Sequence, residues 1–249
     1  MLAHYQTDAG KVRNHNEDSV TIVKNLSGDY LLMVADGMGG HRAGEVASSL
    51  AVTHIGSRFQ SMSTLGTKID AITWLKEIIE EVNTNIIKYA EEHVDATGLG
   101  TTLVCALLTK EYLIFANIGD SSGFVFKNGK LYKVTKDHTY ANFLVDTGEI
   151  RPEEAANHPQ KNVLMRALGA SPKAEVDIFD VENSVDGIFL CSDGLTNMVT
   201  KEQIEKVLND EDLDIEEKVG KLILKSNLRG GNDNISIAVL LINGGVYDK

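Results

Sequence analysis

Acidic residues recur at the ends of the most apolar segments of this sequence. Asp36 follows the run Tyr30–Ala35, and Asp193 comes directly after another apolar run and a serine. Both are followed by glycine, which lets the backbone turn sharply and lets a ligand approach closely. The acidic residues in comparable positions are Glu17, Asp18, Asp36, Asp120, Asp193 and Asp233. A single Asp-Gly pair is common in ordinary turns, but this repetition favours a shared site.

Carboxylates that converge need cations, because their mutual repulsion would otherwise force some of them to take up protons. Few basic residues flank these six positions. A divalent metal ion is therefore the simplest partner. Oxygen-only ligand sets suit Mg²⁺ or Mn²⁺, whereas Zn²⁺ prefers His and Cys, which are absent from these positions.

Strands must bring these residues together. Runs rich in β-branched and apolar residues predict strands at Tyr30–Ala35, Thr101–Leu108, Tyr112–Ile118, Phe124–Phe126, Lys130–Val134, Gly187–Cys191 and Asn234–Ile242. A short segment before Glu17 could be a further strand. Several of these runs are joined by short turns, and Asn128-Gly129 is a hairpin signal. Directly linked strands pair antiparallel, because parallel neighbours need long crossovers.

Helices are predicted in two pairs. The first pair covers Ala43–Phe59 and a longer helix with apolar residues at steps of three and four from Ile72 to Ile86. The second pair begins after Thr200, where Gln203 completes a capping-box pattern, and continues over Ile215–Asn227. One pair precedes most of the strands and the other comes late. This order predicts an α+β fold of antiparallel sheets covered by helices.

Composition excludes several classes of function. The chain has 249 residues with 36 Asp plus Glu against 24 Lys plus Arg, which gives a net charge of −12. Nucleic acid or an anionic membrane would require a basic surface. Cys105 and Cys191 lie in apolar runs and are expected to be buried thiols rather than a disulfide. No apolar stretch approaches the roughly 20 residues of a membrane span. We therefore expect a cytoplasmic protein without membrane insertion.

A set of ordered motifs carries a resemblance to a known family. The motifs are Arg13-x-x-Asn16-Glu17-Asp18, Asp36-Gly37-Met38-Gly39-Gly40-His41 with Ala43-Gly44-Glu45, Gly100-Thr101-Thr102, Gly119-Asp120-Ser121, Asp137-His138, His158-Pro159, Ser192-Asp193-Gly194-Leu195 and Asp233-Asn234. With these motifs in this order, the chain resembles the metal-dependent protein serine/threonine phosphatases of type 2C, in their compact bacterial form. The resemblance covers nearly the whole chain.

The resemblance implies both a fold and a ligand set. The implied fold is a central sandwich of two antiparallel β-sheets with an antiparallel helical pair on each side. Asp36 would bridge two Mn²⁺ or Mg²⁺ ions, which the Gly37 carbonyl, Asp193 and Asp233 would complete. Glu17 and Asp18 would hold metal-bound waters or support that shell. Asp120, with Asp193, would offer a weaker third site.

The implied reaction is hydrolysis of phosphoserine and phosphothreonine in proteins. Two divalent ions lower the pKa of a bridging water, and the resulting hydroxide attacks phosphorus in line. Arg13 offers a planar, permanently charged fork for phosphate oxygens. His41 is the candidate to protonate the departing alkoxide. His138 and His158 are interpreted as structural.

The resemblance also indicates how the chain is organised. Residues 1–249 would form a single catalytic domain with a flap at about 137–170 beside the active site. Apolar spacing around Phe143 and Leu144, followed by Pro152, predicts short helices in this flap. The family implies phosphorylated protein substrates and a cognate serine/threonine kinase. The absence of heptads gives no reason to expect more than a monomer.

One departure from the family creates a rival hypothesis. Ser122 replaces the arginine of the usual Gly-Asp-Ser-Arg, and Gly119-Asp120-Ser121-Ser122-Gly123 then matches the Gly-x-Ser-x-Gly elbow of serine hydrolases. In that reading Ser121 would be the nucleophile, with His138 or His158 as base. The elbow requires a strand followed by a helix, whereas the sequence after Gly123 predicts a hairpin. A second rival is a binding protein that kept the fold and lost turnover, which would be expected to lack some of the metal carboxylates.

Overall fold

The computed structural model describes residues 1–39, 43–93 and 98–242 and shows two antiparallel β-sheets packed face to face. One sheet has the strand order β1-β11-β10-β7-β8, and its strands are Leu2–Asp8, Ile235–Leu241, Gly187–Cys191, Ser122–Lys127 and Lys130–Lys133. The other has the order β2-β3-β5-β6-β9, and its strands are Asp18–Lys24, Tyr30–Met38, Leu103–Leu108, Leu113–Ile118 and Asp177–Val181. A short strand β4 (Gly100–Thr101) pairs with the end of β3.

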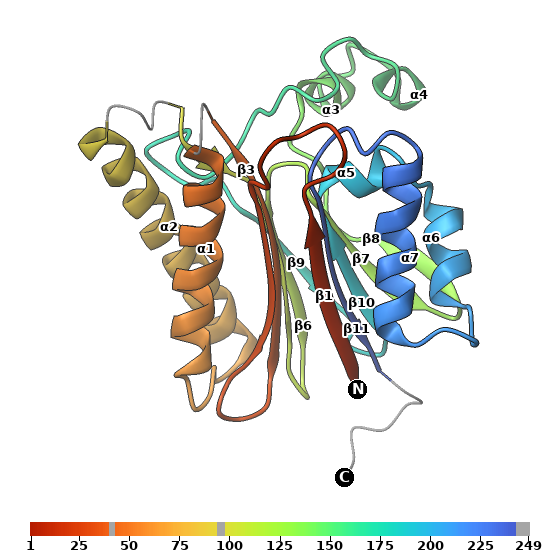
Figure 1. The fold of residues 1–249 in the computed structure, drawn as a ribbon. Coiled ribbons are helices and arrows are strands. Elements are labelled where there is room, and N and C mark those ends of the chain that lie inside the picture. The colour runs from red at the N-terminus through yellow and green to blue at the C-terminus, as the bar shows by residue number, and fades with distance from the viewer. Residues whose placement is uncertain (40–42, 94–97, 243–249) are drawn as a thin grey trace.

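Helices cover the outer face of each sheet (Figure 1). Helices α1 (Ala43–Gln60) and α2 (Lys68–Glu92) lie on the sheet that contains β3, and α5 (Asp193–Thr196), α6 (Lys201–Leu208) and α7 (Ile215–Leu228) lie on the other. Separate buried clusters fill the space under each helical layer and the space between the sheets. The predicted α+β sandwich with helices on both sides is therefore confirmed. None of the helices in the described ranges combines the length and apolar character needed to cross a bilayer.

The flap region stands apart from the sandwich. Short helices α3 (Tyr140–Asp146) and α4 (Pro152–Ala155) project beyond the strand ends, and Figure 1 shows them at one end of the molecule. The predicted short helices in this region are confirmed. Thr139 and Leu164 form an isolated bridge where the chain leaves and rejoins the body, so the base of the flap is narrow.

Some predicted elements differ in extent from the observed ones. The predicted strand Thr101–Leu108 is interrupted at Thr102, where the Asp36 N–H donates to the Thr102 side chain while the Thr102 N–H still donates to the Asp36 carbonyl oxygen. The edge strands β2 and β9 were not predicted. Most of their residues are only partly buried, so the apolar runs that mark the central strands are weaker there.

Candidate metal and phosphate site

Carboxylates from four separate places in the chain meet at one end of the sandwich. Asp18 opens β2 directly opposite Asp36 on β3 in the antiparallel register. Asp193 begins α5 immediately after β10, and Asp233 lies just before the neighbouring strand β11. Antiparallel pairing within each sheet and face-to-face packing of the sheets bring these strand ends together. The structure thus brings together the side chains that the sequence marked as candidate ligands.

Burial and mutual repulsion both raise the pKa values of these acids. Burial is the main cause that raises the pKa of Asp18 to about 7, and repulsion from Asp193 and Asp233 adds to it. Burial also raises the pKa of Asp36 well above its usual value, with further increases from Asp18 and Asp193. The ionised form of each acid is therefore unfavourable while the others are ionised, unless a cation binds to the cluster.

Asp193 and Asp120 show the same pattern. The pKa of Asp193 is raised by burial and by Asp233, although the hydrogen bond from Asn197 opposes the rise. Burial, followed by repulsion from Asp193, raises the pKa of Asp120 to about 7. Asp120 therefore belongs to the same cluster electrostatically, as expected for a further site that shares Asp193.

Two carboxylate oxygens in the cluster are buried without a hydrogen-bond partner. They are Oδ1 of Asp18 and Oδ1 of Asp193, and their second oxygens accept from Ser192 Oγ at 2.8 Å and from Asn197 Nδ2 at 3.0 Å. An unpaired buried oxygen is costly. An oxygen-rich, mutually repelling donor set fits a hard divalent cation such as Mg²⁺ or Mn²⁺.

The side chains are not arranged as a complete coordination shell. Within the described ranges, no group of three His, Cys, Asp or Glu side chains stands in ligating geometry around one point. Asp233 is engaged by Arg13, whose Nη2 donates to its Oδ2 at 2.9 Å, and Asp193 Oδ2 accepts from Asn197. Metal binding would therefore require these contacts to be exchanged for metal–oxygen bonds.

Arg13 lies at the mouth of the cluster, as its predicted role requires. Its side chain is 53% exposed and that of Asp233 is 34% exposed. The guanidinium is thus positioned where an incoming phosphate could reach it. Glu17 also lies here: burial raises its pKa, while Arg13 lowers it.

Close backbone contacts surround Gly37, which follows Asp36 within β3. The Gly37 N–H donates to the carbonyl oxygen of Glu17 at 3.1 Å. A Cβ at Gly37 would fall onto the carbonyl oxygens of Glu17 and Gly44, so no other residue fits there without displacing backbone. Glycine at this position is explained by this close approach.

The histidines occupy different environments. His41 falls outside the described residues, so its predicted role as proton donor is untested. His138 is buried, and its Nδ1 accepts from the Gly119 N–H at 3.2 Å, while its Nε2 lies 3.0 Å from Asp177 Oδ2. Because Nδ1 accepts a hydrogen bond, the ring proton of His138 is on Nε2. His158 lies in the flap region, with its ring 6.0 Å from that of Tyr140.

The elbow hypothesis does not match this geometry. Ser121 is fully buried, and its Oγ pairs with Thr102 Oγ1 at 2.8 Å rather than with a histidine. The segment that follows is the strand β7, whereas the elbow requires a helix at that point. Ser122 itself is buried and pairs with Cys191 across β7 and β10.

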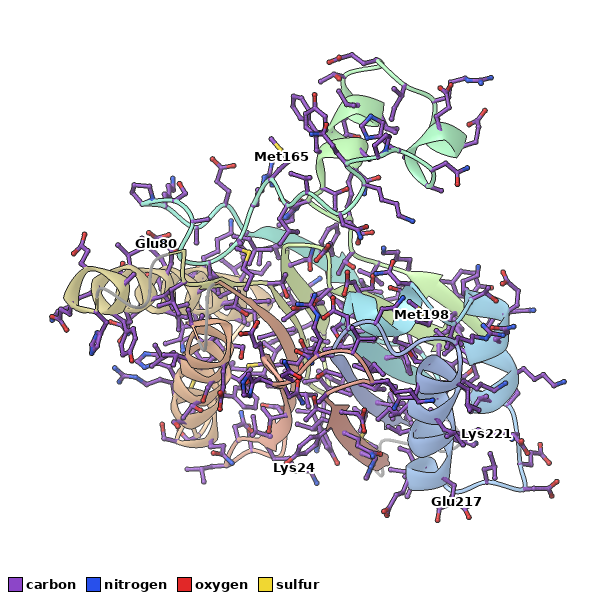
Figure 2. All side chains as sticks on the ribbon, turned by 45° about the horizontal axis from the view of Figure 1, so that its top comes forward. Lys24, Glu80, Met165, Met198, Glu217 and Lys221 are labelled. Atoms are coloured by element: carbon purple, nitrogen blue, oxygen red, sulfur yellow. The ribbon has the colours of Figure 1, made fainter. Side chains whose placement is uncertain are left out.

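A hollow of about 390 Å³ extends from the carboxylates toward the flap. Asp120 and Asp193 line its inner end, and Asn142 and Lys161 line its flap side. In Figure 2, Met165 marks the segment that returns from the flap, and Met198 lies beyond α5 on the body of the protein. A polypeptide bound at the carboxylates would therefore extend into a space bordered by the flap.

The sequence analysis did not single out several residues that support the acids. Ser192 Oγ donates to Asp18, Asn197 donates to Asp193, and Ser48 Oγ donates to the Glu17 carbonyl oxygen at 2.6 Å. Ser192 lies within the motif Ser192-Asp193-Gly194-Leu195, so the sequence could have identified it as a residue that supports the site. Ser48 lies on α1, 31 residues from Glu17, and nothing in the local sequence marks the contact.

Comparison with known proteins gives a consistent result. The family model described as protein phosphatase 2C matches residues 7–228. The chain is 44% identical to the serine/threonine phosphatase stp of Listeria welshimeri, over 100% of this chain and 98% of that protein. It is 34% identical to the protein phosphatase PhpP of Streptococcus pneumoniae, over 95% and 96%.

Solved structures agree with this resemblance. The serine/threonine phosphatase Stp1 from Staphylococcus aureus superposes with a TM-score of 0.88 at 36% identity, over 97% of this chain and 95% of that one. The serine/threonine phosphatase PstP/Ppp of Mycobacterium tuberculosis superposes with a TM-score of 0.86 at 35% identity, over 98% and 99%.

Proposed function

Because the chain belongs to the protein phosphatase 2C family and is a protein serine/threonine phosphatase, we propose that its carboxylate cluster holds two divalent ions, Mn²⁺ or Mg²⁺, for hydrolysis of phosphoserine and phosphothreonine. The observation that supports this most directly is the cluster of mutually destabilised acids, with unpaired buried oxygens on Asp18 and Asp193. Such a cluster is unfavourable alone and is stabilised by divalent cations.

The proposed ligand roles follow the positions of the acids. Asp36, the Gly37 carbonyl, Asp193 and Asp233 would hold the two ions. Asp18 and Glu17 would support the shell or hold its waters. Asp120 shares the electrostatic environment of Asp193 and would contribute a weaker third site.

Bound divalent ions would supply a hydroxide nucleophile for attack on phosphorus near neutral pH. The protein's own residues would bind and orient the substrate. Arg13 would exchange its contact with Asp233 for a bidentate contact with phosphate oxygens. His41 would donate a proton to the leaving alkoxide, an assignment that rests on the sequence alone. The hollow under the flap would receive the polypeptide next to the phosphorylated residue.

The proposal extends to the biological setting. We propose a single catalytic domain with a flap at about 137–170, acting on proteins phosphorylated by a cognate serine/threonine kinase. All the candidate ligands come from one chain, so a monomer suffices for the site. A cytoplasmic location is consistent with the two cysteines, which are buried free thiols.

Metal-dependent release of phosphate from a phosphothreonine peptide tests the proposed function. We expect release with Mn²⁺ and with Mg²⁺, and a fall of at least about 100-fold when EDTA removes the metal. The Asp193→Asn variant should lose the same activity while keeping a cooperative unfolding transition. Release that is unchanged by EDTA, or normal in Asp193→Asn, would contradict the two-ion proposal.

Replacing Arg13 by alanine tests the phosphate contact. We expect KM for the phosphopeptide to rise about ten-fold with a smaller change in kcat, because the lost charge-assisted hydrogen bonds serve mainly to bind phosphate. Arg58→Ala is the matched control, since Arg58 is similarly exposed and pairs with Glu81 on the helical layer away from the site. If steady-state kinetics showed equal effects in both variants, Arg13 would not be part of the phosphate site.

A further inference from the structure

Two buried hydroxyl groups connect the end of β3 at Asp36 with the turn that carries Asp120. Thr102 Oγ1 accepts a hydrogen bond from the Asp36 N–H at 2.9 Å and pairs with Ser121 Oγ at 2.8 Å. Thr102 is 1% exposed, and Ser121 is fully buried. Ser121 directly follows Asp120, so a single side chain, Thr102, lies between two carboxylate-bearing segments.

Thr102 holds the Asp36 peptide on both sides. Besides the bond to the Asp36 N–H, its own N–H donates to the Asp36 carbonyl oxygen at 2.9 Å. Thr101 Oγ1 donates to the same oxygen at 2.9 Å. Both polar backbone groups of Asp36 are therefore fixed by this segment, and the direction of the Asp36 side chain depends on it.

The methyl group of Thr102 contacts the other end of the Asp120 loop. Gly119 has φ of +107°, and a Cβ there would lie 2.5 Å from Thr102 Cγ2. The loop therefore packs on the Thr102 methyl at Gly119 and bonds to the Thr102 hydroxyl at Ser121. These two contacts bracket Asp120 itself.

We propose that Thr102 and Ser121 are positioning residues that set the placement of the Asp36 carboxylate relative to that of Asp120 and thereby the affinity of the cluster for divalent metal. This inference rests on the proposed function. Thr102 contacts the segments of both acids, so its hydroxyl and methyl groups fix how Asp36 and Asp120 lie relative to each other. Partners that orient metal ligands typically contribute 10–100-fold to metal affinity. The serine of the apparent hydrolase elbow thus has a role that does not involve nucleophilic attack.

Calorimetric titration of EDTA-stripped protein with Mn²⁺ alone tests the inference. Thr102→Val keeps the shape and the methyl contact but removes the hydroxyl. Thr109→Val is the matched control, because Thr109 lies at the opposite end of β5, is also buried, and accepts from the N–H groups of Glu111 and Tyr112. Both variants remove a buried threonine hydroxyl that accepts from the backbone, so both should lose thermal stability.

Of the two threonine-to-valine changes, only that at Thr102 should alter metal binding. We expect the Mn²⁺ Kd to rise about ten-fold in Thr102→Val and to stay within about two-fold of wild type in Thr109→Val. Thr102→Ser keeps the hydroxyl and should bind Mn²⁺ nearly as wild type does. Ser121→Ala leaves the Asp36 contact intact but removes the bridge, and it should weaken Mn²⁺ binding in the same direction even if Thr102→Val does not fold.

The outcomes separate this inference from the proposed function. Wild-type affinity in Ser121→Ala, or in folded Thr102→Val, would overturn the positioning role and leave the proposed function standing. Equal loss of affinity in Thr109→Val would also overturn it, because the effect would then follow from lost stability alone. A wild-type protein that binds no Mn²⁺ would overturn both.

Discussion

Asp36→Asn is expected to abolish turnover and, at the same time, to make the metal-free protein more stable. The amide cannot serve as an anionic ligand between two cations, so we expect phosphopeptide hydrolysis to fall at least about 1,000-fold. The same substitution removes one acid whose charge is unfavourable in the folded protein. Burial is the main cause of this penalty, and repulsion from Asp18 and Asp193 adds to it. Melting of EDTA-treated protein at pH 8 should therefore shift upward by a few degrees, about 2–4 °C per kcal/mol.

The opposite direction of the two effects makes this experiment specific. A substitution that merely damaged the fold would lower activity and stability together. Asp180→Asn is a suitable control, because Asp180 is an exposed aspartate on β9 whose pair with Lys68 lies at the surface. It should change neither quantity appreciably. Normal turnover in Asp36→Asn would show that the assigned centre of the site is wrong.

The architecture and the candidate acids could be predicted because their signals are local. Asp-Gly pairs at the ends of apolar runs mark Asp36 and Asp193, and short turns between runs indicate antiparallel strands. The predicted strand Gly187–Cys191 agrees with the observed β10 in both bounds. The structure places these acids in one cluster, while their roles toward metal stay predictions.

The contacts between distant segments could not be predicted in the same way. Arg13 meets Asp233 across 220 positions, and Thr102 meets Ser121 through the packing of the strands that carry them. Such pairs depend on strand order and register, which local periodicity does not determine. The rival catalytic role for Ser121 came from a local motif match alone, and its burial against Thr102 contradicts it.

The pH dependence of stability should also reveal the cluster. Burial raises the pKa of Asp18 and of Asp120 from 3.8 to about 7. Between these two values the folded protein keeps protons that the unfolded chain releases, so folding stability falls as pH rises through this window. We expect the melting temperature of EDTA-treated protein to decrease by at least about 5 °C from pH 5 to pH 8, because each of the two acids costs about 1.4 kcal/mol of stability per pH unit in this window.

Metal should reverse this trend, because cations and protons compete for the same oxygens. With saturating Mn²⁺, stabilisation over the EDTA-treated protein should grow as pH rises from 5 to 8. Asp120→Asn should flatten the metal-free slope, whereas Asp212→Asn, at an exposed position outside the cluster, should leave it unchanged. Acids whose pKa is lowered, such as Glu205 and Asp210, titrate below this window and do not mask the effect. If the metal-free melting temperature stayed level or rose from pH 5 to pH 8, the acids would not be buried and held close together in the folded protein. The argument for a bound cation would then fail.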